Sequence, residues 1–127
     1  MEFTEDEISA HVVSSAFKVH SALGPGLLES VYETCIAYEL AKLGLSVERQ
    51  RALPVLYDGL QIEMGFRLDI IVNDRVVIEI KASEGLLPIH TAQVLTYLKL
   101  GGYRLGMLLN FNVAHMREGI KRVVNNL

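Results

Sequence analysis

The chain has 127 residues, half of them hydrophobic, and a single cysteine. That length is typical of one domain, and the composition excludes a disordered chain or a disulfide-stapled one, because Cys35 has no partner for an internal bridge. No apolar run approaches the roughly 20 residues that a membrane span needs. We therefore expect one soluble domain, residues 1–127, in a reducing cytoplasm and without a membrane partner.

The formal charge of −3 comes from 12 Lys and Arg against 15 Asp and Glu, and it is unevenly distributed. Four of the acids are Glu2, Glu5, Asp6 and Glu7, which leaves 11 acids against 12 bases in residues 8–127. The body of the chain is therefore close to neutral, at +1. An acidic total that arises in the N-terminal segment does not exclude a nucleic-acid partner.

The N-terminal part of the chain is predicted to be helical. Thr4 and Glu7 have the spacing of a capping box, and apolar residues then recur at steps of three and four, which predicts a helix over 5–22. The sequence Gly-Pro-Gly at 24–26 ends this helix, and a second helix is expected over 27–43. The pattern then changes to that of strands, with hairpin signals at 58–59 and 73–74. The expected strands are residues 45–51, 53–57, 61–72 and 76–82.

The C-terminal part mixes helices with one more strand. Pro88 precedes a helical stretch over 89–100, an apolar strand follows at 105–110, and a last helix is expected over 114–124. That helix would carry a basic cluster of Arg117, Lys121 and Arg122. Hairpins combined with one strand–helix–strand crossover predict a mixed sheet flanked by helices, of the α/β (α+β) class. We expect an N-terminal helix within 1–22 and a core over 23–127.

Three ionisable residues stand in otherwise Val- and Ile-rich strands. Glu79 and Lys81 point to the same face of their strand, and Asp69 occupies a similar apolar setting on the preceding one. Two converging carboxylates offer the hard oxygen ligands that suit Mg²⁺ or Mn²⁺, and a nearby lysine can orient water or stabilise phosphate charge. The same alternation also occurs on solvated sheet faces, so both interpretations remain open on spacing alone.

The register of the two strands tests the metal-site hypothesis. A two-residue turn at 73–74 would place Asp69 and Glu79 on opposite faces, whereas a three-residue loop, 73–75, pairs Val72 with Val76 and Asp69 with Glu79. We predict the three-residue loop. It would also place Leu68, Ile70, Ile78 and Ile80 together on the buried face.

The segment Gly26-Leu27-Leu28-Glu29-Ser30-Val31-Tyr32 resembles the signature of the GxxExxY proteins, a family of the PD-(D/E)XK nuclease superfamily. The resemblance runs from about residue 22 to 124 and includes Glu-Arg-Gln at 48–50, the Asp69 strand and Glu79-Ile80-Lys81. It implies a restriction-endonuclease-like αβββαβ core, with an extra N-terminal helix and an extra strand. The proline that gave the superfamily its name is replaced here by Leu68, at a position that varies in the superfamily.

The resemblance also implies roles for individual residues. Asp69 and Glu79 would bind Mg²⁺ or Mn²⁺, with the Ile80 carbonyl as a further ligand and Glu29 as an additional acid from the helix. Lys81 would complete the catalytic set. Without the resemblance, an ordinary acid at a helix N-terminus is the favoured interpretation of Glu29. Tyr32 is interpreted as a packing residue whose hydroxyl orients a neighbour.

The helix over 89–100 carries polar residues that share one face: His90, Gln93 and Tyr97. Gln93 and Tyr97 match the Q-x-x-x-Y pattern of recombination-type exonucleases in the superfamily, which implies contacts with the substrate. On the residues alone, they also fit a polar helix face with Tyr97 half-buried.

The leading hypothesis is a Mg²⁺-dependent nuclease that hydrolyses phosphodiesters in DNA or RNA, with DNA placed before RNA. The alternative is a non-catalytic module that keeps the fold to bind nucleic acid or a protein. A homo-oligomer, in the first place a dimer, would give a duplex-cutting enzyme two sites.

Overall fold

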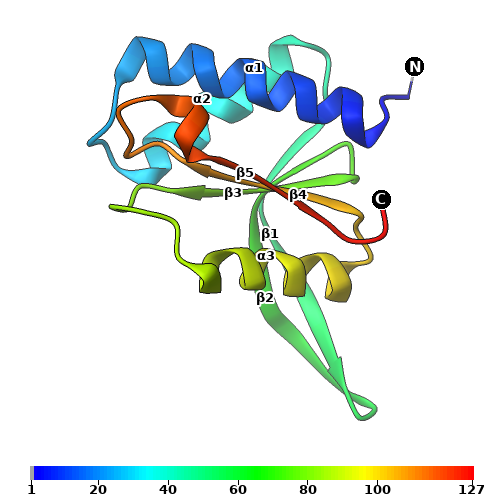
Figure 1. Ribbon diagram of the computed structural model, residues 1–127. Coiled ribbons are helices and arrows are strands. Elements are labelled where there is room, and N and C mark those ends of the chain that lie inside the picture. The colour runs from blue at the N-terminus through cyan, green and yellow to red at the C-terminus, as the bar shows by residue number, and fades with distance from the viewer. Residues whose placement is uncertain (1) are drawn as a thin grey trace.

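The computed structural model describes residues 2–127, so only Met1 of the expected N-terminal segment lies outside it. A five-stranded mixed sheet has helices on both of its faces (Figure 1), and the strand order is β1-β2-β3-β4-β5. The elements are α1 (Glu5–Leu23), α2 (Glu29–Lys42), β1 (Val47–Tyr57), β2 (Leu60–Val72), β3 (Val76–Lys81), α3 (Pro88–Gly101), β4 (Leu105–Asn110), a 3₁₀ turn η1 (Met116–Gly119) and β5 (Ile120–Val124). None of the helices in residues 2–127 is long and apolar enough to cross a membrane.

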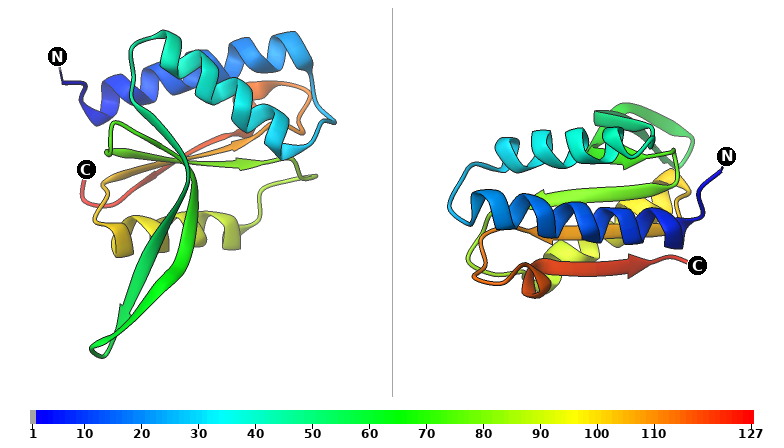
Figure 2. Two further views of the ribbon diagram at one scale, coloured as in Figure 1. Left: turned by 180° about the vertical axis from the view of Figure 1, so that it is seen from behind. Right: turned by 90° about the horizontal axis from the view of Figure 1, so that it is seen from above.

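Two apolar layers hold the helices to the sheet. The α1 and α2 helices cover one face, and α3 covers the other (Figure 2). Ile8 and Val12 of α1 and Ile36 of α2 pack in the first layer, whereas Val94 and Leu98 of α3 pack in the second. The α2-β1-β2-β3-α3-β4 order is the expected αβββαβ core, with α1 before it and β5 after it. The fold-class prediction is therefore confirmed.

The first helix begins as its sequence predicts. The Thr4 hydroxyl accepts a hydrogen bond from the Glu7 backbone N–H at 3.2 Å, and the Glu7 carboxylate accepts from the Thr4 N–H at 2.9 Å. This reciprocal pair satisfies two of the N–H groups that a helix start leaves without partners. Both bounds of α1 lie within one residue of the prediction.

The strands expected at 45–51 and 53–57 are one strand, β1, which forms a long hairpin with β2. The prediction of two strands was wrong because Pro54 interrupts the pattern without ending the strand. The register between the strands shifts between Leu53 and Val55, so the irregularity is absorbed as a bulge. Figure 2 shows the hairpin projecting well beyond the helices.

The last helix expected from the sequence, 114–124, is also wrong. Residues 116–119 form a 3₁₀ turn, and residues 120–124 form β5, which pairs antiparallel with β4. A Cβ at Gly119 would stand 2.0 Å from the Asn110 carbonyl oxygen, so the turn lies tight against the end of β4. The β-branched Ile120, Val123 and Val124 favour a strand once a sheet edge is available for pairing. Lys121 and Arg122 are adjacent on this strand and so point to opposite faces.

The predicted register between β2 and β3 is confirmed next to the loop, and the ladder ends one position short of the predicted Asp69–Glu79 pair. Val72 pairs with Val76 and Ile70 pairs with Ile78, so the connecting loop is residues 73–75. The placement of Leu68 was wrong: it packs in the α3 layer, away from Ile70, Ile78 and Ile80. The alternation breaks at Asp69, which lacks a paired residue in β1 and whose carboxylate accepts the Ile80 N–H.

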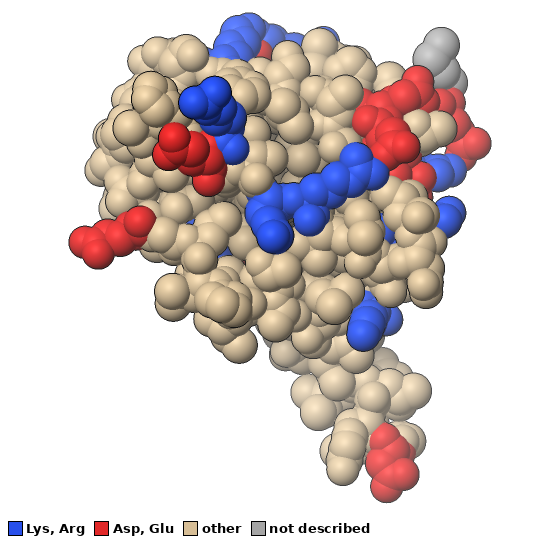
Figure 3. All heavy atoms as spheres, in the orientation of Figure 1, with Lys and Arg blue, Asp and Glu red and all other residues tan. Residues whose placement is uncertain are grey.

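The acidic N-terminal segment is bound to the body of the protein. Arg75 contacts Glu2 at 3.0 Å and Glu5 at 3.4 Å, and Arg122 of β5 contacts Asp6. In Figure 3 a basic band crosses the face over β5 and ends beside these acidic residues. The N-terminal acids thus neutralise two arginines of the body, which the charge count by segments did not anticipate.

Candidate metal centre

Asp69 and Glu79 meet where β2 and β3 begin to separate. The Asp69 backbone N–H donates to Glu79 Oε1 at 3.3 Å, and the Ile80 N–H donates to Asp69 Oδ2 at 2.9 Å. Each carboxylate thus accepts a backbone N–H of the opposite strand, in place of a regular ladder bond at this point. The structure therefore brings together the two acids that the sequence singled out, and their backbone partners fix both side chains.

Glu79 is the most perturbed of the acids. Its side chain is only 5% exposed, and burial raises its pKa to about 9 from the ordinary value of 4.5. The negative charge of Asp69 adds to this increase, while the positive charge of Lys81 opposes it. A buried carboxyl beside a second one retains its proton near neutral pH unless a cation neutralises the pair.

Lys81 ends β3 on the same side of the strand as Glu79, by the alternation of side chains. It is half-buried, and it is paired in register with Asn110 at the end of β4. The amide of Asn110 is 1% exposed; it accepts from the Ser83 N–H at 3.2 Å and donates to the Ser83 carbonyl at 3.0 Å. Asn110 thereby fixes the chain that leaves β3 directly after Lys81.

A second buried carboxylate, Glu33 of α2, lies next to this pair, and the sequence patterns did not single it out. Glu33 is 7% exposed; it accepts from Arg49 at 2.9 Å and from the Gln50 amide at 2.7 Å. The same Gln50 amide nitrogen lies 3.4 Å from Asp69 Oδ1. Gln50 adopts a left-handed backbone conformation, with φ of 52°, which turns its amide between the two acids. Two features of the sequence could have pointed to Glu33. It lies one helical turn after Glu29, and the polar pair Arg49-Gln50 stands inside a strand.

Glu29 is placed differently from the expectation of three converging acids. It is the first residue of α2, and its side chain is exposed. In residues 2–127 no three acidic, histidine or cysteine side chains gather closely enough to form a metal cluster, so Asp69 and Glu79 stand as a pair. Tyr32 has the predicted packing role: its hydroxyl donates to the Gly24 carbonyl and accepts from the Leu27 N–H, and its ring stacks on Phe111.

The α3 helix brings Tyr97 to the acid pair. Its ring stacks on Phe66 with centroids 4.9 Å apart, and burial raises its pKa, with the charges of Glu79 and Asp69 adding to the effect. The Gln93 side chain, one helical turn before Tyr97, opposes this increase in the Tyr97 pKa. His90 instead faces its own helix start, where Nδ1 accepts the Leu87 N–H at 3.1 Å. Tyr97 and Gln93 therefore border the acid pair, and His90 caps the helix that carries them.

Comparisons with known proteins support the same fold. The solved structure titled "Crystal structure of SSO0001" is similar, with a TM-score of 0.55 and 22% sequence identity; the alignment covers 97% of this chain and 60% of the other. The chain thus spans about three fifths of the length of that protein. No curated protein sequence matches significantly. The sequence profile of the PD-(D/E)XK nuclease superfamily matches residues 6–123, almost the whole chain, and the protein therefore belongs to this superfamily.

Proposed function

We propose that the protein is a divalent-metal-dependent nuclease that hydrolyses phosphodiester bonds. The observation that carries this proposal is the buried Glu79 beside Asp69, with a pKa raised to about 9. A protein that used these acids only for structure would gain from replacing one of them by a neutral residue, because a like-charged buried pair is costly. Membership of a nuclease superfamily supports the same conclusion.

The donor chemistry fits Mg²⁺ or Mn²⁺. Both ions prefer oxygen ligands, and the carboxylates of Asp69 and Glu79 with the carbonyl of Ile80 provide them from adjacent strands. Glu29 stands outside the pair, so we assign it a weaker contribution than the two strand acids. When bound, the cation would polarise the phosphate and lower the pKa of a water molecule.

The remaining residues would act on the substrate directly. Lys81 holds a positive charge beside the acids, where it would orient the attacking water or offset the charge that develops on the phosphate. The Tyr97 hydroxyl and the Gln93 amide would hydrogen-bond the phosphate backbone from the α3 side. His90 lies one turn before Gln93, and its free Nε2 would extend the same polar edge.

The proposed substrate is nucleic acid, with DNA placed before RNA on superfamily membership. A homodimer would supply two acid pairs for the two strands of a duplex. We place the activity in the cytoplasm, because the only cysteine, Cys35, is free.

The test is a cleavage assay on labelled DNA and RNA, single- and double-stranded, with Mg²⁺, Mn²⁺ or EDTA. We expect cleavage that requires the metal, and a loss of about 10²- to 10⁴-fold in Asp69→Asn, Glu79→Gln and Lys81→Ala. Calorimetric titration of Mn²⁺ without substrate should show binding to the native protein and none to Asp69→Asn. Light scattering on the same samples gives the oligomeric state.

Glu63→Gln and Lys99→Ala are the matched controls, because both residues are exposed: Glu63 lies on the projecting part of the hairpin, and Lys99 lies near the C-terminal end of α3. Activity that survives in Glu79→Gln and Lys81→Ala would remove the proposed site. Nucleic-acid binding without cleavage under any metal condition would establish the non-catalytic module instead.

A further inference from the structure

A pocket of about 660 Å³ lies beyond the C-terminal end of β4, between α1 and the turn before β5. It is separate from the acid pair and is formed by three parts of the chain. Its lining residues are Phe17, His20 and Ser21 of α1, Gly24 and Pro25 after it, and Ala114, His115, Met116 and Arg117.

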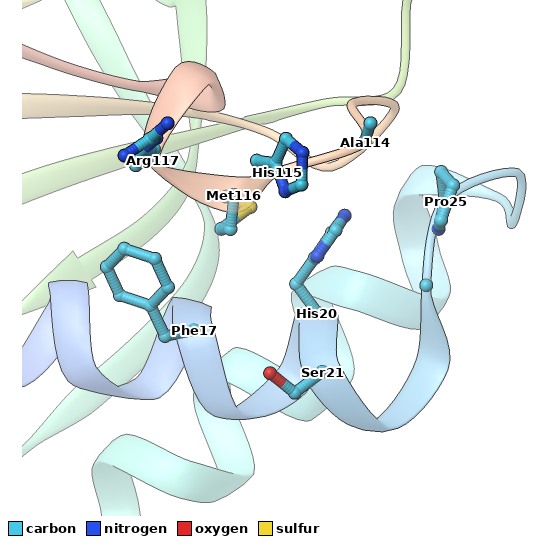
Figure 4. A pocket seen from close by; sticks show the side chains of 9 residues that line it. Phe17, His20, Ser21, Pro25, Ala114, His115, Met116 and Arg117 are labelled. Carbon is cyan, nitrogen blue, oxygen red and sulfur yellow. The ribbon is translucent and has the colours of Figure 1, made fainter.

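The pocket combines basic and aromatic side chains and has no acidic one among its lining residues. Figure 4 shows His20 rising from α1 toward His115, and Arg117 lying across from Phe17. His20 is fixed in place, with Nε2 2.8 Å from the Val113 carbonyl oxygen, to which it donates. Phe17 leaves 41% of its surface exposed, so part of its ring is available to a ligand.

Arg117 differs from most arginines of this protein. The ion pairs of residues 2–127 hold Arg49, Arg51, Arg75 and Arg122 against carboxylates, and none involves Arg117. Its planar guanidinium is therefore open to a ligand, and phosphate is the group that its paired N–H donors match best. A metal ion fits poorly, because two histidines beside a guanidinium form no group of three ligands within residues 2–127.

The pocket shares structural elements with the acid pair. Gly24 lines the pocket, and its carbonyl accepts the hydroxyl of Tyr32, one turn after Glu29. On the other side, β4 ends at Asn110, which pairs with Lys81, and the chain continues from there into the pocket wall. Glu79 shares the face of Val77, which packs under α3, whereas the pocket adjoins α1. The two sites thus lie at the same ends of neighbouring strands, β3 and β4, but toward opposite faces of the sheet.

We propose that this pocket binds a backbone phosphate of the nucleic-acid strand, away from the bond that is cut, with Arg117 and His115 as donors and Phe17 stacking on the adjoining base. The strand would run from this phosphate over the C-terminal ends of β4 and β3 to the acid pair. The inference rests on the proposed nuclease function for its substrate class. Stacking on an exposed aromatic beside a basic group is the general way in which proteins bind single strands.

The test measures binding without cleavage, by fluorescence anisotropy of labelled oligothymidine and of a duplex in EDTA. Arg117→Ala should weaken binding about tenfold and reduce the slope of log K against log salt by about 0.7 for the single strand or 0.9 for the duplex. Arg117→Lys keeps the charge and loses the planar fork, so its affinity should lie between those of the wild type and Arg117→Ala. Lys99→Ala removes the same charge from the far end of α3 and should change neither quantity.

The second measurement is the NMR titration of the ring protons of His20 and His115. We expect them to shift with a 5′-phosphorylated trinucleotide and with its 5′-hydroxyl form. A response to the phosphorylated form and to inorganic phosphate alone would assign the pocket to a strand end instead of an internal diester, and would overturn the proposed path.

The outcomes separate this inference from the proposed function. Metal-dependent cleavage with equal affinities and salt slopes for Arg117→Ala and the wild type would overturn the pocket assignment and leave the nuclease proposal standing. Histidine shifts and weaker Arg117→Ala binding without any cleavage would support the pocket and overturn the nuclease. No response to any phosphate ligand would overturn the inference.

Discussion

Replacing Glu79 by glutamine should stabilise the metal-free protein, and the gain should grow with pH. Glutamine has nearly the shape of a protonated glutamate and keeps an oxygen to accept the Asp69 N–H. It removes a carboxyl that must either hold a proton above its ordinary pKa or carry a buried charge. The substitution thus removes the cost of the charge and preserves the contact.

The magnitude follows from the two pKa values. In the unfolded chain the Glu79 carboxyl ionises near 4.5, whereas in the folded protein its pKa is about 9. Below pH 4.5 both states hold the proton, and the substitution has no electrostatic effect. Between the two values the unfolded state alone loses the proton, so wild-type stability falls by about 1.4 kcal/mol per pH unit. Above pH 9 both states are ionised, and the cost stays constant.

A pH of 7 lies about two and a half units above the pKa of the Glu79 carboxyl in the unfolded chain. Glu79→Gln should therefore be more stable than the wild type by about 3 kcal/mol at this pH. The difference should approach about 6 kcal/mol at pH 9. For a domain of this size, 3 kcal/mol corresponds to a melting temperature roughly 10 °C higher.

The assay is urea unfolding in EDTA, monitored by circular dichroism, at several pH values between 5 and 8.5. Glu63→Gln on the hairpin is the control: its carboxyl is exposed, and its stability difference should not vary with pH. Saturating Mg²⁺ should raise the melting temperature of the wild type and leave that of Glu79→Gln unchanged, because only the wild type retains the ligand. A stability difference that is constant from pH 5 to 8.5 would refute the assignment of a buried, protonated Glu79.

Three further predictions concern other residues around the site. Tyr97→Phe should keep its stacking on Phe66 and lower the melting temperature by only a few degrees. Its kcat should fall about tenfold with KM nearly unchanged. An unchanged kcat would remove the hydroxyl from the proposed chemistry. Gln50→Gly should be about 1 kcal/mol more stable in urea unfolding than Gln50→Ala, because both lose the amide but only glycine readily adopts φ of 52°; equal stabilities would contradict a strained backbone there. Gly119→Ala should cost at least about 2 kcal/mol in the same assay, because its Cβ would collide with the Asn110 carbonyl; a neutral effect would mean that the turn moves freely.

Local patterns in the sequence predicted most of the core. The capping box at Thr4, the three-residue loop before Val76 and the apolar runs of β3 and β4 are all local signals, and the structure agrees with each. The register then followed, because only one loop length places both acids on one side. The close approach of Asp69 and Glu79 could therefore be predicted from the residues of the two strands and the loop between them.

The errors arise where a distant contact decides the local structure. Residues 120–124 were expected to continue a helix, and they form a strand because β4 offers an edge with which their β-branched residues pair. Leu68 lies on the opposite face of the sheet from the one predicted. The cause is the break in the strand at Asp69, whose side chain, in place of its backbone, accepts the Ile80 N–H. Glu33 was missed for a similar reason: its link to Asp69 runs through Gln50 of β1, which is distant from both in the sequence.

The projecting hairpin is a part of the molecule that can vary in length independently of the rest. Beyond the register shift at Leu53 and Val55, the large apolar side chains Leu56, Tyr57, Leu60 and Met64 are each more than 60% exposed. Residues 55–64 are therefore a natural position for an inserted reporter or for a shorter turn. A longer or a shorter arm at this position would leave the acid pair unchanged.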